Sequence, residues 1–553
     1  MRIPRRIALP SRAMVAAAIA LIGAIPVINL WPSQAASAQA SDLFEITDGN
    51  ITQEPGSTVP DWANVFGLNG SGQVVVKNAE GSISQSFTQD ALESVSSEPN
   101  CYTAFSGTSN KNGDAFSSWQ WGPQSVPTKD DISNTYSLVT IDPSDGHRIL
   151  MFGAERITNN GDTHIDFEFT HSKVGLTTTS TNSSGCGSGG FSGSRTVGDL
   201  LVAMDYTNGG TQPVPAVYRW NGTSYNQITI PSNDVAAVGL KENTAPISCG
   251  DWNCRDSSGN VITTIPKNEF VEGFLDLDDQ ALGGFSGCIN SFMTHTRSSQ
   301  SFTAELKDLT VNSLNSCDAN ISVGNDGINE VGDPHTVTGH VNVRDAATFQ
   351  NAPAGTTINF AIVSGPGSLS ASSCTTTDDS GSCSVTLNSS VAGTTIVSAS
   401  TNVTVDGDTL YRTTNGDAGQ GGSGNLTKHW VDASVAIAPS ATNEVGNSHQ
   451  FTVTVNALPS GTSPVTFDSI TPSVSPTPGS MTSTCDNPTV SVDGNTATCT
   501  VTINSNTTGV FTANATAQVT MGGVQVTRST SGNSGPNGSG PATKTYVDAR
   551  ITV

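Results

Sequence analysis

The feature that most constrains this chain is a long internal repeat in its second half. The segment Asn329–His335 (NEVGDPH) returns as Asn443–His449 (NEVGNSH), a period of 114 residues from position 329 to position 443. A unit of this length exceeds a solenoid repeat and is close to the roughly 100 residues of a β-sandwich domain. The second half is therefore expected to be a string of sandwich domains.

The start of the repeated unit sets the expected domain boundaries. The stretch that begins at Asp318 (DANI) corresponds to the one that begins at Asp432 (DASV), and Asp548 (DARI) begins a third copy. We expect a front domain over residues 41–317, repeats over 318–433 and 434–547, and the first strand of a further repeat over 548–553. The chain is accordingly interpreted as the front part of a longer protein.

Composition favours exported all-β domains and excludes some partners. Only 13% of the residues are charged, whereas the chain holds 56 glycines and many short β-branched runs such as Phe451–Val455. The formal net charge of −24 comes without a basic patch, so nucleic acid and an anionic membrane surface are not expected as partners. Any membrane attachment would depend on an anchor outside this chain.

The first 40 residues have the pattern of a secretory signal peptide. Four arginines precede an apolar run over residues 13–30, and Ala38-Gln39-Ala40 forms a small-x-small cleavage site. An uncleaved N-terminal membrane anchor is the alternative. Either interpretation predicts a secreted or cell-surface location.

All ten cysteines follow the signal, and an even number in an exported chain favours disulfides. In the repeats, Cys374 can pair with Cys383 and Cys485 with Cys499, each clipping a hairpin. Six cysteines remain in the front domain, where 15 connectivities are possible. The nearest pair there is Cys249 with Cys254.

The front domain is expected to be a jelly-roll or concanavalin-like double sheet. Alternating stretches typical of half-buried strands recur between turn signals, for example at residues 148–153, 164–169 and 200–204. The Ser/Gly-rich stretch 177–194 is predicted to be an exposed loop held by Cys186. Glycine-rich stretches at 415–426 and 531–543 are predicted to be loops before the closing strand of each repeat.

Motifs in both halves resemble secreted bacterial modular surface proteins. In the front domain these are WQWG at Trp119, FGAER at Phe152, DFEF at Asp166 and TVGDLL at Thr196, which resemble an N-terminal domain that precedes Ig-like or prealbumin-like modules. In the first repeat, GTTINF, TDDSGSCSVTL and AGTTIVSA are similar to bacterial Ig-like domains of the invasin and intimin type. The resemblance implies location and architecture, and no catalytic activity.

Catalytic patterns are scarce in this sequence. Asp166 and Glu168 are two residues apart on an expected strand and share one face, as a glycoside hydrolase pair could. The alternative is that both pair with Arg156 or Lys129 inside the sandwich, because a buried acid needs a partner.

Two further sets are candidate binding residues. Several acids in or beside loops could hold a structural Ca²⁺, although no complete calcium-loop pattern is present: Asp114, Asp130, Asp131, Asp162 and Asp166. Trp119 and Trp121 face one side of an expected strand and could stack on a sugar, with core packing as the alternative.

Lys428 and Lys544 occupy equivalent places in the two repeats. Each could form a covalent bond to an Asn such as Asn443, with Glu444 as the nearby acid. The alternative is an exposed lysine that protects a strand edge.

These observations predict a non-catalytic exported protein with a β-sandwich head on an Ig-like stalk. We expect it to bind an extracellular glycan or protein, with no cofactor beyond the possible Ca²⁺. A secreted polysaccharide-active enzyme with accessory Ig-like domains and a purely structural envelope protein are the alternatives.

Overall fold

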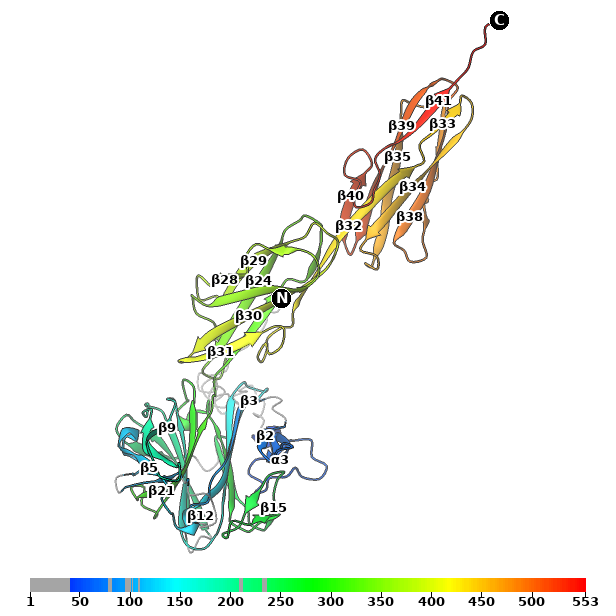
Figure 1. Cartoon of the computed structure of the whole chain (residues 1–553). Helices are drawn as coiled ribbons and strands as arrows, with labels where there is room; N and C mark the ends of the chain where they lie inside the picture. Colours follow the sequence, from blue (N-terminus) through cyan, green and yellow to red (C-terminus); the bar gives the residue numbers. More distant parts are fainter. Residues whose placement is uncertain are drawn as a thin grey trace, which may run out of the picture.

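The chain is an elongated, almost entirely β-stranded molecule in a computed structural model. The structure describes residues 40–77, 82–94, 101, 103–107, 110–207, 212–230 and 236–553, so positions 1–39 of the predicted signal peptide lie outside the described residues. The front domain lies at one end, the two repeats follow in line, and the C-terminus leaves at the far end (Figure 1). The all-β prediction is confirmed. In the described part of the chain, no helix has the length and apolar character needed to span a membrane.

Two antiparallel sheets form the centre of the front domain and enclose one apolar core. In spatial order, one sheet contains β14 (Val238–Glu242), β19 (Phe270–Asp276), β7 (Arg148–Arg156), β6 (Ile132–Ile141) and β3 (Ser82–Gln89). The facing sheet contains β13 (Tyr225–Ile228), β12 (Gln212–Trp220), β11 (Leu200–Thr207), β8 (Thr163–Thr170), β20 (Ser291–Arg297) and β21 (Leu306–Ser313). Phe152, Phe167, Phe169 and Phe292 pack together between the two sheets.

Two further layers cover the outer faces of this sandwich. A four-stranded sheet packs on the outer face of the six-stranded sheet and contains β4 (Ala104–Phe105), β5 (Gln120–Gly122), β10 (Gly187–Ser192) and β9 (Gly175–Thr181). The other outer face is covered by α2 (Ala40–Leu43), α3 (Trp62–Val65), β1 (Phe66–Leu68), β2 (Val74–Val76), β15 (Ile247–Ser248), β16 (Cys254–Arg255), β17 (Val261–Ile262) and β18 (Thr264–Ile265). Short 3-10 turns are η1 (Phe116–Ser118), η2 (Thr128–Asp130) and η3 (Gln280–Leu282).

The additional layers overturn two predictions. Strands β7 and β8 are buried at every residue, whereas the alternating sequence predicted strands with one exposed face. The alternation is present, but its polar positions lie beneath a second layer instead of in solvent. The stretch 177–194, predicted to be a loop, contributes to the hairpin of β9 and β10, and Cys186 lies at its turn.

The first repeat is a sandwich of two sheets with its own core. One sheet contains β22 (Asp318–Gly324), β24 (His335–Arg344), β29 (Ser382–Asn388) and β27 (Ser368–Leu369), with β25 (Gln350–Asn351) paired to β24. The other contains β28 (Ser373–Thr375), β26 (Thr357–Ser364), β30 (Gly393–Val405) and the first part of β32 (Leu426–Ala438), with β31 (Asp408–Thr413) and β23 (Gly327–Glu330) beside them. Trp430 is buried in this core.

The second repeat has the same plan. The second part of β32 pairs with β34 (His449–Leu458), followed by β38 (Thr496–Asn504) and β36 (Ser480–Ser483), with β37 (Thr489–Val490) on β38. The facing sheet contains β33 (Ala441–Glu444), β41 (Ala542–Val547), β39 (Gly509–Met521) and β35 (Val465–Ser475), with β40 (Val524–Ser529) on β39. The predicted loops before β32 and β41 are present in both repeats.

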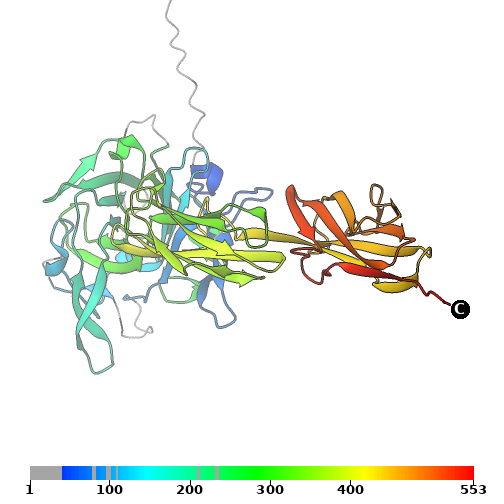
Figure 2. The same ribbon diagram turned by 90° about the horizontal axis from the view of Figure 1, so that it is seen from above.

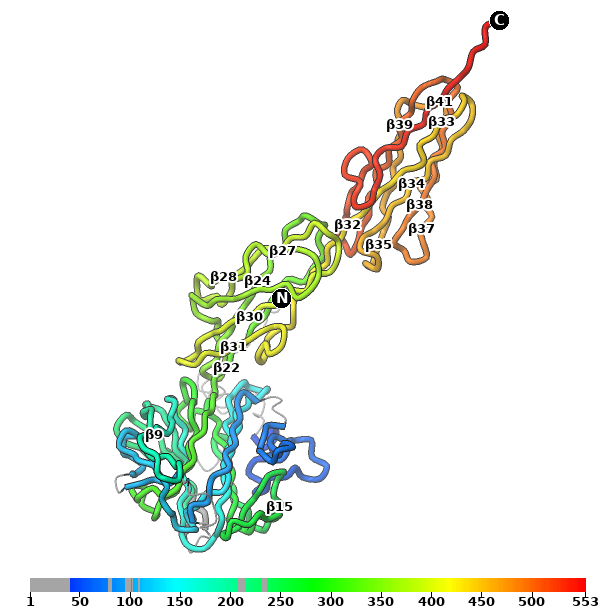
Figure 3. The backbone as a smooth tube through the Cα atoms, in the orientation of Figure 1, coloured from blue at the N-terminus to red at the C-terminus, as the bar shows by residue number. Residues whose placement is uncertain are grey.

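A single strand joins the two repeats. In β32, Trp430 pairs with Gly393 of the first repeat, and Asp432 pairs with Leu458 of the second. The change of partner therefore falls inside an unbroken strand, with no linker between the sandwiches. Figure 2 shows this yellow strand running from one repeat into the next, and the tube in Figure 3 follows the same path.

Ionic contacts reinforce each junction. Arg528 of the second repeat bonds Glu330 of the first at 2.7 Å and also bonds Asp432. Arg412 takes the equivalent position within the first repeat and bonds Asp318 at 2.7 Å, while Lys173 of the front domain bonds Asp408 of the first repeat. The Cys288–Cys317 disulfide and a hydrogen bond from the Cys288 amide to Asp406 tie the front domain to the first repeat.

All ten cysteines form disulfides, which points to an oxidising compartment. The pairs named from the sequence are present: Cys249–Cys254, Cys374–Cys383 and Cys485–Cys499. The two that sequence left open are Cys101–Cys186 and Cys288–Cys317.

Candidate functional site

Trp119 and Trp121 belong to the layer that covers the six-stranded sheet. Gln120 between them is exposed, so the two rings share one side as predicted, but that side faces inward. Their exposed fractions are 0% and 8%. Trp119 packs edge-on against Phe105 and Phe191. Both tryptophans therefore pack in the core, as the alternative predicted, and neither ring has an exposed face on which a sugar could stack.

Asp166 and Glu168 share the outer face of β8, as their spacing predicts, and each is bound by an arginine. Arg195 Nε donates to Glu168 Oε1 at 2.5 Å, and Arg297 Nε donates to Asp166 Oδ2 at 2.6 Å. The predicted partners were wrong: Lys129 pairs with Asp130, and Arg156 lies 4.0 Å from the centroid of the Tyr206 ring. The alternative that both acids form ion pairs inside the domain was therefore correct, but with different partners.

The environment of Glu168 opposes a role as general acid. Burial would raise the pKa of this carboxyl, but Arg195 and His295 outweigh burial and hold it at about 2. The Tyr225 hydroxyl also donates to Glu168 Oε1 at 2.6 Å. A carboxyl that stays ionised and is enclosed by donors cannot supply the proton that glycosidic cleavage requires.

The five acids predicted to bind calcium do not form one cluster. Asp130 bonds Lys129 and the Thr163 hydroxyl, while Asp166 is occupied by Arg297. Asp162 is exposed beside a polar pocket, and Asp114 accepts from Arg195 through its backbone carbonyl. Asp131 alone of the five lies close to a buried group of acids from other segments.

Among the described residues, two groups of acids are close enough to share an ion. One consists of Glu45, Asp48 and Asp61, and the other of Asp90, Glu93 and Asp308. Sequence reasoning missed both groups. Glu45, Asp48 and Asp61 lie within one short stretch but match no metal-binding motif, whereas Asp308 is more than 200 residues from Asp90 and Glu93, so its proximity to them could not be inferred from spacing.

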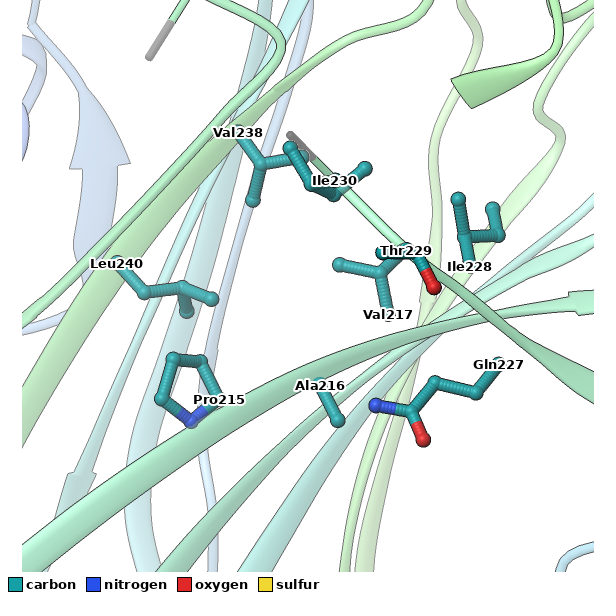
Figure 4. Close-up of a pocket in the computed structure, with 9 residues that line it drawn as sticks. All are labelled: Pro215, Ala216, Val217, Gln227, Ile228, Thr229, Ile230, Val238 and Leu240. Atoms are coloured by element: carbon teal, nitrogen blue, oxygen red, sulfur yellow. The ribbon is translucent and has the colours of Figure 1, made fainter. Parts of the chain in front are cut away.

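The open edge of the head sandwich carries a cleft of mixed polarity, lined mainly by aliphatic residues. Strands β13 and β14 end the two sheets on this side, and the space between them has a volume of about 390 Å³. Figure 4 shows aliphatic side chains from β12, β13 and β14 converging on it. Its lining residues are Pro215, Ala216, Val217, Gln227, Ile228, Thr229, Ile230, Val238 and Leu240. The cleft is continuous with the core between the sheets, because Ile228, Val238 and Leu240 also pack on that core.

Lys428 and Lys544 are both buried, with exposed fractions of 1% and 0%, so the interpretation as exposed edge lysines was wrong. Lys428 Nζ donates to Asn329 Oδ1 at 2.7 Å, which makes Asn329 its partner in place of Asn443. Lys544 Nζ has no acceptor among the described residues. Burial lowers the pKa of both ammonium groups.

Comparison with known proteins adds little to this description. No family model matches the sequence, and no curated protein matches it. Among solved structures, the D0–D1 domain of intimin is 20% identical with a TM-score of 0.16, over 41% of this chain and 99% of that chain. The D00–D0 domain of intimin is 16% identical with a TM-score of 0.16, over 35% of this chain and 84% of that chain. At these scores the likeness supports no conclusion about function, and the sandwich fold rests on the chain's own sheets.

Proposed function

We propose that this chain is a non-catalytic surface or secreted protein that presents its front domain for binding to an extracellular partner. The observation that carries the proposal is the arrangement of the domains. The head lies at one end of two sandwiches that share a continuous strand, and ionic contacts brace the junction. Such a rod holds a head at a distance from its base and contributes no chemistry of its own.

Two features of the head support binding over catalysis. The paired carboxylates of β8 are each held by an arginine, which argues against their use as the acid and base of a polysaccharide-active enzyme. The cleft at the open edge combines aliphatic side chains with exposed polar groups, which suits a protein segment that offers both apolar side chains and hydrogen-bonding groups. We therefore favour a protein ligand over a glycan.

The test is binding of the whole chain to arrays of extracellular-matrix proteins and glycans. We expect saturable binding to a protein, and we expect Ala216→Trp to abolish it because the indole fills the cleft. Val490→Trp is the matched control, since it adds the same ring to an exposed position on the second repeat.

Three results would count against parts of this proposal. An array without any hit, from folded protein, favours the purely structural role. Equal binding by the Ala216→Trp variant and the wild type removes the cleft as the site. Release of reducing ends from an arrayed polysaccharide contradicts the non-catalytic assignment.

A further inference from the structure

Four buried carboxylates meet at the closed edge of the head sandwich, opposite the cleft. Asp90 follows β3, and Glu93 lies three residues after Asp90. Asp131 precedes β6, and Asp308 belongs to β21. One oxygen from each of Asp90, Glu93 and Asp308 lies within 4.8 Å of the others. The exposed fractions of the four residues are 7%, 2%, 0% and 0%.

Three of these carboxylates have one oxygen held by donors and one without a donor. Thr103 Oγ1 donates to Asp90 Oδ1 at 3.0 Å, and the Thr103 amide donates to Glu93 Oε1 at 3.1 Å. Ser94 donates from its amide and its hydroxyl to Asp131 Oδ2. Within the described part of the chain, Asp90 Oδ2, Glu93 Oε2 and Asp131 Oδ1 accept no hydrogen bond from an amide or hydroxyl group, although the Glu93 and Asp131 carboxyls are close enough to share a proton. Burial of a polar oxygen without a hydrogen-bond donor costs folding free energy, so a ligand that contacts these three atoms would stabilise the folded domain.

Charge in this group is far from balanced by protein. Arg255 lies beside it and donates to the backbone carbonyls of Asp90 and Ser133. Repulsion between the neighbouring buried carboxylates opposes charging all of them at once. The group must therefore take up protons or a cation.

We propose that Asp90, Glu93 and Asp308, with Asp131 beside them, form a binding site for one Ca²⁺ ion. Ligand oxygens lie about 2.3–2.6 Å from Ca²⁺, so two oxygens on one ion are at most about 5 Å apart, which the observed spacing satisfies. The set contains oxygen ligands alone, as a hard cation prefers. Mg²⁺ fits less well, because it keeps several waters and binds through one or two carboxylates.

The position of the site gives the ion a structural role. Asp90 and Asp131 lie at the ends of β3 and β6 in one sheet, whereas Asp308 lies on β21 in the other. Asp308 Oδ2 already accepts the Ile132 amide at 2.6 Å, and the Thr135 and Thr310 hydroxyls bond across the same edge at 3.0 Å. An ion here would bridge the two sheets along the edge formed by β3 and β21, whereas the opposite edge, formed by β13 and β14, carries the cleft.

The experiment uses the whole chain, stripped with a chelator and dialysed, then titrated with CaCl₂ by calorimetry at pH 7. We expect saturable binding with one ion per chain at this site and a higher melting temperature of the front domain, since a ligand that binds only the folded state stabilises it. Glu93→Gln should weaken binding by at least about tenfold, because it removes a charged ligand. The matched control, Glu45→Gln, changes the other acidic group and should leave this binding intact.

The alternative is that the acids are simply protonated, and the same measurements distinguish it. In that case the wild type shows no binding heat and the same melting temperature in calcium and in chelator, which overturns the proposal even if a variant fails to fold. Loss of binding in Glu45→Gln, with Glu93→Gln unaffected, also overturns it by assigning the ion to the other group.

Discussion

Arg195 shows how single residues organise the outer layer of the head. Its guanidinium lies 4.2 Å from the centroid of Phe116 and 4.9 Å from that of Trp119, and Trp220 and Tyr225 lie further round it. Glu168 supplies the opposite charge. Cation–π contacts and a buried ion pair thus join the six-stranded sheet to the layer that covers it. The tryptophans that could have been ligand contacts serve this junction instead.

Replacing Glu168 with glutamine should destabilise the front domain by about 3–5 kcal/mol at pH 7, because Arg195 is left buried without its counter-charge. The pKa of Glu168 is about 2 in the folded protein, below its ordinary value of 4.5. Its contribution is therefore complete above about pH 4.5 and is lost as the pH falls toward 2. Chemical denaturation across this range should show the two proteins converging at low pH.

Glu305→Gln is the control for that comparison. Glu305 pairs with Lys307 at 3.0 Å, but both side chains are partly exposed, so the change should stay within about 0.5 kcal/mol. Equal losses in the two variants would show that the Glu168 pair contributes no more than a surface pair.

At the level of elements, sequence and structure agree best in the repeats. There the residues of β24 and β39 alternate between buried and more exposed positions, because each sheet has one covered face. The two-residue period of apolar side chains in the sequence therefore predicts these strands correctly. In the head the same alternation misleads, since the outer faces of β7 and β8 lie under another layer. Local disulfides could be named from spacing, whereas Cys101–Cys186 joins segments that only the fold brings together. The acidic group at the closed edge was missed for the same reason.

Disulfides that close loops of different length should differ in their effect on stability. Cys101 and Cys186 are 85 residues apart, whereas Cys374 and Cys383 are 9 apart. Because a longer closed loop restricts the unfolded chain more, we expect Cys101→Ser/Cys186→Ser to cost its domain roughly 4–5 kcal/mol, against roughly 3 for Cys374→Ser/Cys383→Ser. Calorimetric transitions of the two domains measure both losses, and equal losses would contradict the loop-length argument.

For the whole molecule, the continuous strand β32 should determine how stiff the rod is. A Gly-Ser-Gly-Ser insertion between Val431 and Asp432 separates the part that pairs with the first repeat from the part that pairs with the second. It should leave both cores folded while it frees the domains to bend, because a Gly/Ser segment behaves as a flexible coil. Small-angle scattering should show a broader distribution of lengths.

The control for the insertion is the same segment placed between Pro476 and Thr477, in the exposed loop that joins β35 to β36 at the end of the second repeat away from the junction. That variant should keep the scattering profile of the wild type. An unchanged profile for the β32 insertion would mean that the Arg528 contacts alone hold the two repeats in line.

The parallel pairs β23–β32 and β33–β41 give the molecule a mechanical property. In each repeat the chain enters beside the first strand of the pair and leaves through the second. A pull on the two ends of the chain therefore draws the paired strands along each other in opposite directions. Their hydrogen bonds are loaded together in shear instead of opening one after another, so each repeat resists tension along the rod far better than it would resist peeling from one edge.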